Sequence, residues 1–477
     1  MTSAKGAIRA TAAAIADGRA SAFDAVEECL RRIDERDGDL GAVIALRSDE
    51  ARAEARELDR RRADSGRPAG PLDGVPVLVK DNEDVTGLPT RKGSATRRDF
   101  AVATADEVVP ALLRRAGAVI VGKTNLPEFA TEGFTDNLLD GPTRNPWDLR
   151  YSPGGSSGGA GAALSAGLVP IATGTDGGGS VRIPAGMCGL LGLKATHGAI
   201  GRWPAADWID FSTYGPMATT VDDLRLLFSL MVGWLPGDPS SAPFPRDVSR
   251  FAGAAPSHVV IADRTSPLGP LPPTVAASFG AAAAYFAALW DVPVTRLEPD
   301  DVFAGLGDPD LDWFVLATAE HVNSLGRTWT QDHLDDMSPA TAEFMRDGLA
   351  VTVDDYISAR RRRAGFTRRL DDLLGDTGLL LTPTIAAEGW LADGRLSADT
   401  EPGMLLPPAA YSTAMQNVTG HPAISVPAGR YESGLPYGLQ ITAPRWRDDL
   451  LLDVATVWES RYPWPRTATG YDEFRLG

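Results

Sequence analysis

Apolar residues recur along the chain with two spacings, and the change between them predicts where helices and strands lie. Helical spacing runs from about residue 5 to residue 65, and Ser21 and Asp24 stand there in the order of an N-terminal capping pair. Continuous apolar runs predict buried strands at 74–80, 118–121, 258–262, 292–297, 379–382, 423–427 and 438–442. Further helices are expected at 108–115, 221–231, 274–289, 356–374 and 448–460. Strands that alternate with helices predict an α/β fold whose sheet is covered on both faces.

The composition is that of a soluble globular protein, with 43% hydrophobic and 23% charged residues. A length of 477 residues allows about three domains, and a single large α/β domain is also allowed. The net charge of −17 argues against a nucleic-acid partner, because a basic surface supplies most of the affinity for nucleic acid.

Cysteine content and the N-terminus favour the cytoplasm. Cys29 and Cys188 are too few for a disulfide framework or a thiolate metal site, and a reducing compartment is expected. The N-terminus lacks the apolar core of about 7–15 residues that a signal peptide needs. No run approaches the roughly 18 apolar residues of a membrane span, so no membrane association is expected.

The stretch from Tyr151 to Pro184 carries the candidate chemistry. It contains Ser156 and Ser180, each next to a run of glycines, joined by small and apolar residues. Glycine surrounds a side chain where the backbone passes close to another group or takes a positive φ. Two such serines in one segment indicate a reaction centre built largely from backbone.

A literal phosphate-loop pattern, G-x-x-x-x-G-K-T, occupies residues 117–124. A phosphate loop follows a strand and precedes a helix. Here a predicted helix precedes Gly117, the middle residues Ala-Val-Ile-Val favour a strand, and Pro127 follows closely. The pattern is interpreted as a helix, a glycine cap and a buried strand, with nucleotide binding as a competing hypothesis.

A second pattern, G-x-S-x-G at 154–158, is that of the nucleophile elbow of α/β-hydrolases. That elbow follows an apolar strand, whereas the residues before Gly154 favour a loop. A downstream acid and histidine would also be needed, and only His421 has a motif-like setting. The dinucleotide fingerprint fails at Leu164 and no histidine pair has metal-ligand spacing, so neither a cofactor nor a metal is expected.

Three features remain: Lys80 at the end of a predicted buried strand, Ser156 between glycines, and Ser180 after three glycines. A hydroxyl is a weak nucleophile without a base, and a buried lysine with a lowered pKa can be that base. The backbone amides around Ser180 can surround an oxyanion. Each feature also has an ordinary alternative: Lys80 as a surface lysine, Ser156 as a turn residue, Ser180 as a helix N-cap.

The chain resembles the amidase signature family in motifs that occur in order across nearly its whole length. The central blocks are Gly154-Gly-Ser-Ser-Gly-Gly159 and Thr175-Asp-Gly-Gly-Gly-Ser-Val-Arg-Ile-Pro184, with shorter matches at 74–81, 122–129, 141–148, 215–218, 381–384, 417–422 and 438–440. The resemblance implies one domain with a central twisted mixed β-sheet covered by helices on both faces. Its parts would be N-terminal helices at 1–70, a signature core at 71–235, a variable substrate cover at 236–375 and the rest of the core at 376–477.

The resemblance also implies a Ser–cis-Ser–Lys triad. Lys80 matches the family's lysine, Ser156 the serine held by a cis peptide bond, and Ser180 the nucleophile that forms an acyl-enzyme. Neutral Lys80 would accept a proton from Ser156, which relays the proton of Ser180 to the leaving amine. The implied oxyanion donors are the amides of Gly177, Gly178, Gly179 and Ser180.

Other residues are expected to support this triad. Asp176 and Arg182 would form an ion pair that holds the glycine loop, with Ser157 beside it. The sequence departs from the family at Gly177, which predicts a more mobile loop. It departs again at Ile183, where the tRNA-linked amidotransferase subunit typically has glutamine.

The expected reaction is hydrolysis of amide C–N bonds by a stand-alone enzyme, with carbamates (urethanes in particular) and esters as further candidate substrates. An apolar or aryl acyl group is favoured by the pocket residues that the resemblance implies, which are Phe134, Leu138, Leu139, Trp208, Phe211 and Tyr214. Ordinary core packing is the alternative for each of them. The competing function is a glutaminase subunit of a tRNA amidotransferase, which would need partner chains. Otherwise the expected partner is a small-molecule substrate, and the expected assembly is a monomer or a homodimer.

Overall fold

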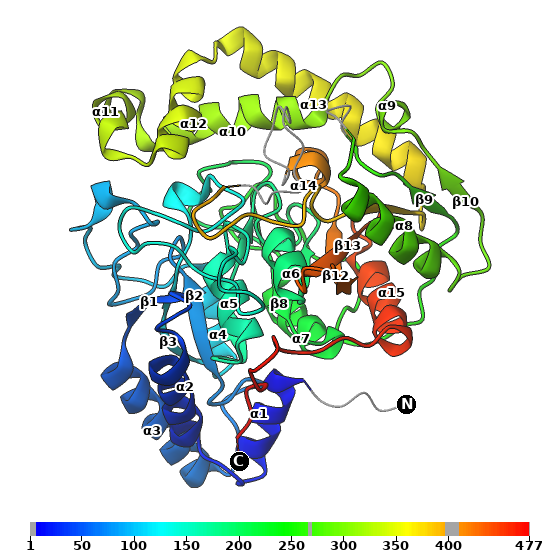
Figure 1. Ribbon diagram of the computed structural model, residues 1–477. Helices are drawn as coiled ribbons and strands as arrows, with labels where there is room; N and C mark the ends of the chain where they lie inside the picture. Colours follow the sequence, from blue (N-terminus) through cyan, green and yellow to red (C-terminus); the bar gives the residue numbers. More distant parts are fainter. Residues whose placement is uncertain (1–5, 266–269, 396–409, 477) are drawn as a thin grey trace.

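The strands of the described chain, residues 6–265, 270–395 and 410–476 of a computed structural model, form two sheets and a short ladder (Figure 1). They are β1 Val43–Leu46, β2 Pro76–Lys80, β3 Val119–Thr124, β4 Ile171–Ala172, β5 Thr175–Asp176, β6 Leu191–Lys194, β7 Thr213–Tyr214, β8 Met217–Ala218, β9 Val259–Ile261, β10 Val294–Arg296, β11 Leu379–Pro383, β12 Ala423–Arg430 and β13 Pro436–Thr442. The larger sheet has the order β10-β9-β11-β13-β12-β6-β8, the smaller has the order β1-β3-β2-β4, and β5 pairs with β7.

Both sheets are mixed. In the larger sheet β9 is parallel to β10 and β11, and antiparallel pairs lead from β11 through β13, β12 and β6 to β8. In the smaller sheet β2 is parallel to β3 and β4, whereas β1 is antiparallel to β3. The predicted α/β class is confirmed, and its strands divide between two sheets.

The helices of the described residues include those that the sequence predicts at 108–115, 221–231, 274–289, 356–374 and 448–460, each of which starts and ends within about three residues of the prediction. They are α1 Ala7–Ala16, α2 Ala22–Arg36, α3 Ser48–Ser65, α4 Val108–Arg115, α5 Gly158–Ser165, α6 Arg182–Cys188, α7 Val221–Met231, α8 Pro273–Ala287, α9 Pro299–Val302, α10 Pro309–Leu325, α11 Arg327–Asp332, α12 Pro339–Ala350, α13 Val353–Leu374, α14 Ala410–Thr419 and α15 Asp448–Arg461. Ser21 and Asp24 form the expected capping box at the start of α2.

One element in the N-terminal region differs from the expectation. Residues 43–46, expected to be helical with their neighbours, form the strand β1. Val43 pairs with Thr124, the last residue of β3, so the partner of this short apolar run lies about eighty positions further along the chain. Such a strand is difficult to recognise in the sequence when helical spacing lies on both sides of it, because its pairing partner is not local.

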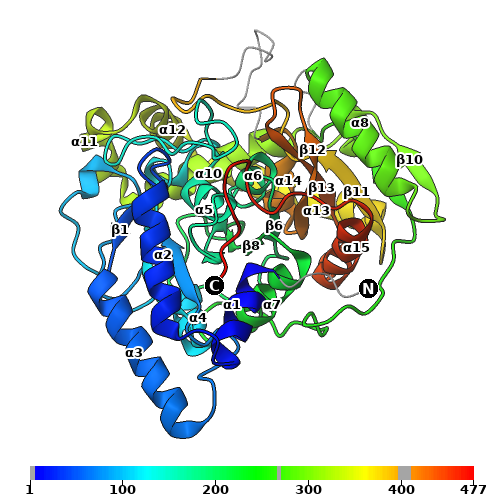
Figure 2. The same ribbon diagram turned by 60° about the horizontal axis from the view of Figure 1, so that its bottom comes forward.

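Helices bury their apolar faces on the sheets (Figures 1 and 2). On the smaller sheet, Leu30 of α2 joins Val121 of β3 in one buried cluster. On the larger sheet, Phe286 of α8 and Trp458 of α15 belong to a second cluster. The helices α10, α11, α12 and α13 lie together across the top of the molecule in Figure 1, and all four come from the region expected to cover the substrate.

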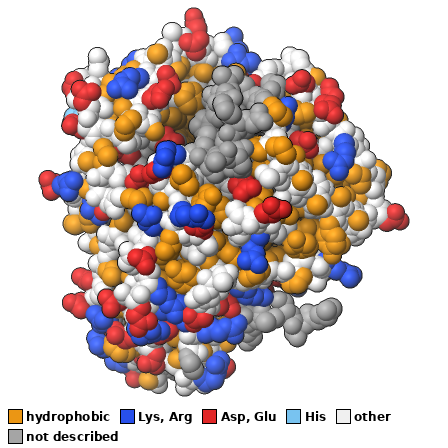
Figure 3. All heavy atoms as spheres, in the orientation of Figure 1, with side chains coloured by type: hydrophobic (Ala, Val, Ile, Leu, Met, Phe, Trp, Pro, Cys, Tyr) orange, Lys and Arg blue, Asp and Glu red, His pale blue; other side chains and the backbone are white. Residues whose placement is uncertain are grey.

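Acidic and basic side chains are interspersed over α2 and α3, at the lower left of Figure 3. They include i, i+3 and i, i+4 pairs such as Glu28 with Arg31 and Glu57 with Arg61. Such pairs stabilise an exposed helix by about 0.2–0.5 kcal/mol each. Among the described residues, no helix is both long and apolar enough to cross a membrane.

Candidate active site

Strand β2 ends at Lys80, whose side chain is completely buried. Its Nζ lies 2.8 Å from the hydroxyl oxygen of Ser156 and 3.0 Å from that of Thr175. Asn82 donates a hydrogen bond of 2.9 Å to the same Thr175 hydroxyl. A neutral amine has N–H donors and one lone pair, so Lys80 can donate to Thr175 and accept from Ser156 at the same time.

Burial lowers the pKa of the Lys80 ammonium to about 7, and it outweighs the opposing effect of the Glu83 and Asp176 carboxylates. The positive charge of Arg202 acts in the same direction as burial. A substantial part of the protein therefore holds Lys80 as a neutral amine near pH 7, the condition under which a lysine can act as a general base.

The two serines of the glycine-rich stretch lie on loops that touch. Ser156 precedes α5, and its peptide bond to Gly155 is cis, as the resemblance implied. Ser180 lies between β5 and α6, and its carbonyl accepts a hydrogen bond of 3.1 Å from the amide of Ser157. Ser156 and Ser180 both line a small cavity of about 30 Å³. The structure thus brings Lys80 and both serines together from three segments of the chain.

A buried ion pair holds the loop that carries Ser180. Arg182 donates to both carboxylate oxygens of Asp176, at 2.9 and 2.8 Å, as the sequence predicts. Burial by itself raises the pKa of the Asp176 carboxyl, but Arg182 together with Lys194 and Asn417 outweighs this effect and holds the pKa at about 2. The guanidinium also donates to side chains of α14 and β13, namely Gln416, Asn417 and Gln440. The C-terminal part of the chain therefore anchors the loop.

Three amides of this loop have no hydrogen-bond acceptor among the described residues: those of Gly177, Gly178 and Ser180. The amide of Gly179, expected to be a fourth oxyanion donor, instead donates to the Asp176 carboxylate at 2.8 Å. The difference arises because the Asp176 side chain turns back onto its own loop three residues later, a habit of aspartate in turns that the glycine pattern does not reveal.

Two tryptophans lie directly on the glycine loop. A Cβ atom at Gly177 would lie 2.0 Å from the ring of Trp208, and one at Gly178 would lie 2.6 Å from the ring of Trp313. The Trp313 Nε1 also donates a hydrogen bond of 2.7 Å to the Gly177 carbonyl. Close packing of Trp208 thus accounts for glycine at position 177, where the sequence alone predicted only a mobile loop.

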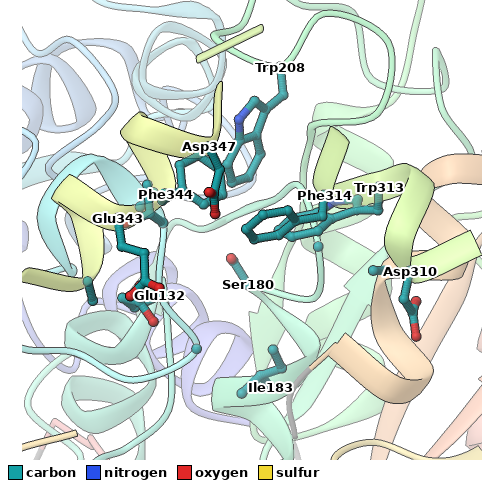
Figure 4. Close-up of a pocket in the computed structure, with 16 residues that line it drawn as sticks. Glu132, Ser180, Ile183, Trp208, Asp310, Trp313, Phe314, Glu343, Phe344 and Asp347 are labelled. Atoms are coloured by element: carbon teal, nitrogen blue, oxygen red, sulfur yellow. The ribbon is translucent and has the colours of Figure 1, made fainter. Parts of the chain in front are cut away.

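A cavity of about 430 Å³ opens at Ser180, a size typical of small-molecule sites (Figure 4). Figure 4 shows Ser180 between Phe314 on one side and Glu132 with Glu343 on the other. Its large apolar walls are Ile183, Trp208, Trp313, Phe314 and Phe344. Its charged lining residues are Glu132, Asp310, Glu343 and Asp347.

Of the pocket residues expected from the sequence, Trp208 lines this cavity. Phe211 is buried behind Trp208, and their rings stack with centroids 6.0 Å apart. Tyr214 is fully buried in β7, and its hydroxyl donates to Glu107. Phe211 thus supports Trp208 from behind, and neither Phe211 nor Tyr214 lines the cavity.

The loop from 131 to 143 lines the cavity with a residue other than those the sequence predicts. Phe134 packs beside Trp390, with ring centroids 6.5 Å apart, and Leu138 is 58% exposed. Neither Phe134, Leu138 nor Leu139 lines the cavity, whereas Glu132 does. Apolar character alone does not show which positions of an irregular loop face the cavity and which face away from it.

Helices α10 and α12 supply lining residues that sequence reasoning assigned only to a general cover. On α10 they are Asp310, Trp313 and Phe314, and on α12 they are Ala340, Glu343, Phe344 and Asp347. Each set has the i, i+3, i+4 spacing of a single helix face. That spacing is visible in the sequence, but it does not say what the face contacts.

The two competing motifs have ordinary structures. Gly117 follows α4 with a φ of +97°, and β3 begins two residues later, so the predicted order of helix, glycine and strand is confirmed and leaves no phosphate loop. The Lys123 Nζ is buried and donates to Asp81 at 3.0 Å and to the Glu83 carbonyl at 2.6 Å. From residue 131 to residue 153 the chain forms only isolated bridges, at Asn145, Asp148 and Tyr151, so the strand that a nucleophile elbow needs is lacking there.

The Amidase family model matches residues 24–452 of this chain. The chain therefore belongs to the amidase family, as its motifs indicate, and its class is that of the amidase-family hydrolases.

Relatives cover nearly the whole chain. The putative amidase AmiA2 of Mycobacterium tuberculosis is 36% identical, over 92% of this chain and 90% of that protein. The acylamidase of Rhodococcus erythropolis is 33% identical, over 95% and 94%, and a glutamyl-tRNA(Gln) amidotransferase subunit from a Synechococcus species is 33% identical, over 93% and 94%. Among solved structures, a bacterial aryl acylamidase of the amidase signature family matches with a TM-score of 0.85 at 26% identity, over 96% and 97%.

Proposed function

We propose that this protein hydrolyses amide C–N bonds through an acyl-enzyme on Ser180, with Ser156 as the proton relay and Lys80 as the base. The observation that carries the proposal is the 2.8 Å contact between the Lys80 Nζ and the Ser156 hydroxyl in a fully buried setting. A buried, easily neutralised amine next to a serine is the arrangement that activates a hydroxyl without histidine.

The proposed reaction begins with Lys80 neutral. Ser180 attacks the substrate carbonyl while its proton passes to Ser156, and the Ser156 proton passes to Lys80. When the tetrahedral intermediate collapses, Ser156 protonates the departing amine and recovers a proton from Lys80. Water then attacks the ester on Ser180 through the same relay, releasing the acid and restoring the triad.

The oxyanion donors in this proposal are amides of the glycine loop. The amides of Gly177, Gly178 and Ser180 have no acceptor among the described residues, which leaves them available to a substrate oxygen. Loss of one such donor typically slows acyl transfer by about 10²–10³. Asp176 and Arg182 act indirectly in this proposal, since their ion pair holds the loop and neither residue lines the cavity at Ser180.

The proposed acyl group is apolar or aryl. Trp208, Trp313, Phe314 and Phe344 wall the cavity beside Ser180, and two of the relatives are an acylamidase and an aryl acylamidase. Carbamates, including urethanes, and esters present the same carbonyl to the same nucleophile, so we include them as candidate substrates.

A glutaminase component of a tRNA amidotransferase is the alternative, since one relative belongs to such an enzyme. Glutamine carries an α-carboxylate, and its recognition calls for a cation. Among the described residues, the four charged ones that line the cavity are all acidic, which favours the stand-alone hydrolase. Ile183, at a position where the amidotransferase subunit typically has glutamine, also favours the stand-alone hydrolase.

The test uses purified protein with a fluorophosphonate probe and a panel of amide, carbamate and ester that share one acyl group. We expect Ser180→Ala to abolish both labelling and turnover, and Ser156→Ala to reduce turnover strongly. Full turnover by Ser180→Ala, or labelling that moves to Ser156, would contradict the assignment. Activity of the single chain on simple anilides would exclude the glutaminase as its main role. A cytoplasmic location, a monomer or homodimer and the four-part division of the chain stay predictions.

A further inference from the structure

The charged residues that the structure describes around the cavity at Ser180 all have the same sign. Its lining includes Glu132, Asp310, Glu343 and Asp347 and no lysine, arginine or histidine among the described residues. Glu132 comes from the loop after β3, Asp310 from the first turn of α10, and the other two from α12. Figure 4 shows the Glu343 side chain pointing toward Glu132, with the Asp347 carboxylate above Ser180. Three separate parts of the chain thus bring negative charge to one small volume.

These four carboxylates have no cationic partner in the described part of the protein. None of its ion pairs involves them, although ion pairs are frequent elsewhere in the cover. The contrast is clear on α10, where Asp312 accepts three hydrogen bonds from Arg362. Two positions earlier, Asp310 is only 1% exposed, and neither of its carboxylate oxygens has a hydrogen-bond partner. A buried acid without a partner inside a cavity indicates that the partner is a ligand.

The arrangement is unfavourable without such a ligand. Burial raises the pKa of Glu132 to about 7, and the negative charge of Glu343 adds to the effect. Burial also raises the pKa of Asp310 and that of Asp347. Glu343 and Asp347 stand at i and i+4 on α12, where like charges destabilise a helix. A bound cation would relieve each of these repulsions at once.

The apolar walls suit the same kind of ligand. Trp208 and Trp313 meet edge to face with centroids 5.7 Å apart, and Phe344 lies 6.4 Å from Trp208. Aromatic faces attract a cation that lies within about 6 Å, most strongly in a desolvated site. Aromatic faces and unpaired carboxylates together recognise an organic cation, while an anionic ligand would meet repulsion from all four acids.

We propose that the preferred substrates are amides that carry a protonated amine, whose ammonium group binds among Glu132, Glu343 and Asp347 while the carbonyl lies at Ser180. This inference rests on the proposed amide hydrolysis and specifies its substrate class. Asp310 lines the same cavity, where a nearby cation would favour its charged form. The recognition is electrostatic, so it weakens as salt screens the exposed carboxylates of α12.

The first experiment measures binding and needs no turnover. Calorimetry with Ser180→Ala compares two isosteric pairs of p-nitroanilides and benzylamides. One pair places the charge in the acyl group, as 4-(ammoniomethyl)phenylacetyl against 4-ethylphenylacetyl p-nitroanilide. The other places it in the amine portion, as 4-(ammoniomethyl)benzylamide against 4-ethylbenzylamide of phenylacetic acid. We expect the charged member of at least one pair to bind about tenfold tighter or more, and the advantage to shrink in high salt.

The second experiment removes the acids. In the Ser180→Ala background, the double change Glu343→Gln and Asp347→Asn is expected to remove most of the preference for the charged member of the pair. Asp354→Asn, an exposed acid at the start of α13 outside the cavity, is the matched control and is expected to keep the preference. Both changed positions on α12 are exposed, so folding is expected to be retained.

Three outcomes would overturn the inference: equal or weaker binding of the charged member in both pairs, no binding of either charged compound, or an unchanged preference in the double variant. The proposed amide hydrolysis is tested separately, by measuring turnover of the neutral anilide by the unchanged protein. Turnover without a charge preference would reject the substrate class and keep the hydrolase. A charge preference in binding without any turnover would reject the hydrolase and keep the cation site.

Discussion

Lys80 is a position where stability and activity should oppose each other, and Lys80→Met is the change that separates them. Methionine has nearly the same length and is apolar, so it fills the same buried space at the end of β2. It removes the base of the proposed relay, and it also removes a group that resists burial when protonated.

The magnitude follows from the buried amine. Its pKa falls from 10.5 in the unfolded chain to about 7 in the fold, and at about 1.4 kcal/mol per tenfold change in proton affinity the buried lysine costs about 5 kcal/mol below pH 7. Methionine avoids this cost but leaves the hydroxyls of Ser156 and Thr175 without their partner, a loss of about 1 kcal/mol each. Near pH 7 we therefore expect Lys80→Met to raise the free energy of unfolding by about 2–3 kcal/mol.

The sign of the effect depends on pH. Because the folded pKa lies below the unfolded one, the destabilisation by lysine is complete below pH 7 and disappears as pH rises toward 10.5. The advantage of methionine should thus shrink by about 1.4 kcal/mol per pH unit across this window and reverse at its upper end. Titrating groups that do not interact with Lys80 contribute equally to both proteins and cancel in the difference.

The assay is equilibrium unfolding in urea, followed by circular dichroism at several values between pH 6 and 10 under conditions where refolding is complete. Lys123→Met is the matched control, since this second buried lysine donates to the Asp81 carboxylate at 3.0 Å. Its loss leaves a buried carboxylate unpaired and should destabilise the fold by about 3–5 kcal/mol. In parallel, kcat/KM of the unchanged protein should rise with an apparent pKa near 7, the value for the Lys80 ammonium.

Two results would refute this reasoning. The first is a Lys80→Met protein that is less stable than the unchanged protein at every pH, which would mean that lysine is held as a well-paired ammonium. The second is a kcat/KM that stays flat between pH 6 and 9, which would remove the neutral amine from the rate-limiting chemistry.

Two further predictions concern the glycine loop. Gly177→Ala should lower kcat/KM by about 100-fold or more, because the new methyl group would lie 2.0 Å from the Trp208 ring and displace a proposed oxyanion donor. Adding Trp208→Leu should restore part of the activity, and normal kinetics of Gly177→Ala alone would contradict the packing argument. Asp176→Asn should lower the free energy of unfolding by about 3–5 kcal/mol, because it leaves the buried Arg182 without its counter-charge. The same substitution at the exposed Asp372 should change it by less than about 1 kcal/mol in urea unfolding, and equal effects at both sites would contradict the role of the buried pair.

Elements that depend on neighbouring residues could be predicted closely. The helices α4 and α7 begin and end at the expected residues, since amphipathic spacing and flanking breakers act over a few positions. The strand β1 was missed because its pairing partner lies on β3. The sequence also predicted the Gly179 amide as an oxyanion donor, because the glycine pattern does not show that this amide donates to the Asp176 carboxylate instead.

The amino-acid sequence determined the family, the α/β class and the residues that carry the proposed chemistry. It did so because the glycine-framed serines, and the lysine after a run of apolar residues, are local patterns in the chain. Folding decided that the Lys80 Nζ reaches a serine 76 positions away, and which side chains surround Ser180. Helical spacing shows that Asp310 and Trp313 share a face, but which cavity that face lines depends on how α10 packs over the glycine loop. The packing of α10 and α12 therefore forms the acidic, aromatic pocket from which we infer cationic substrates.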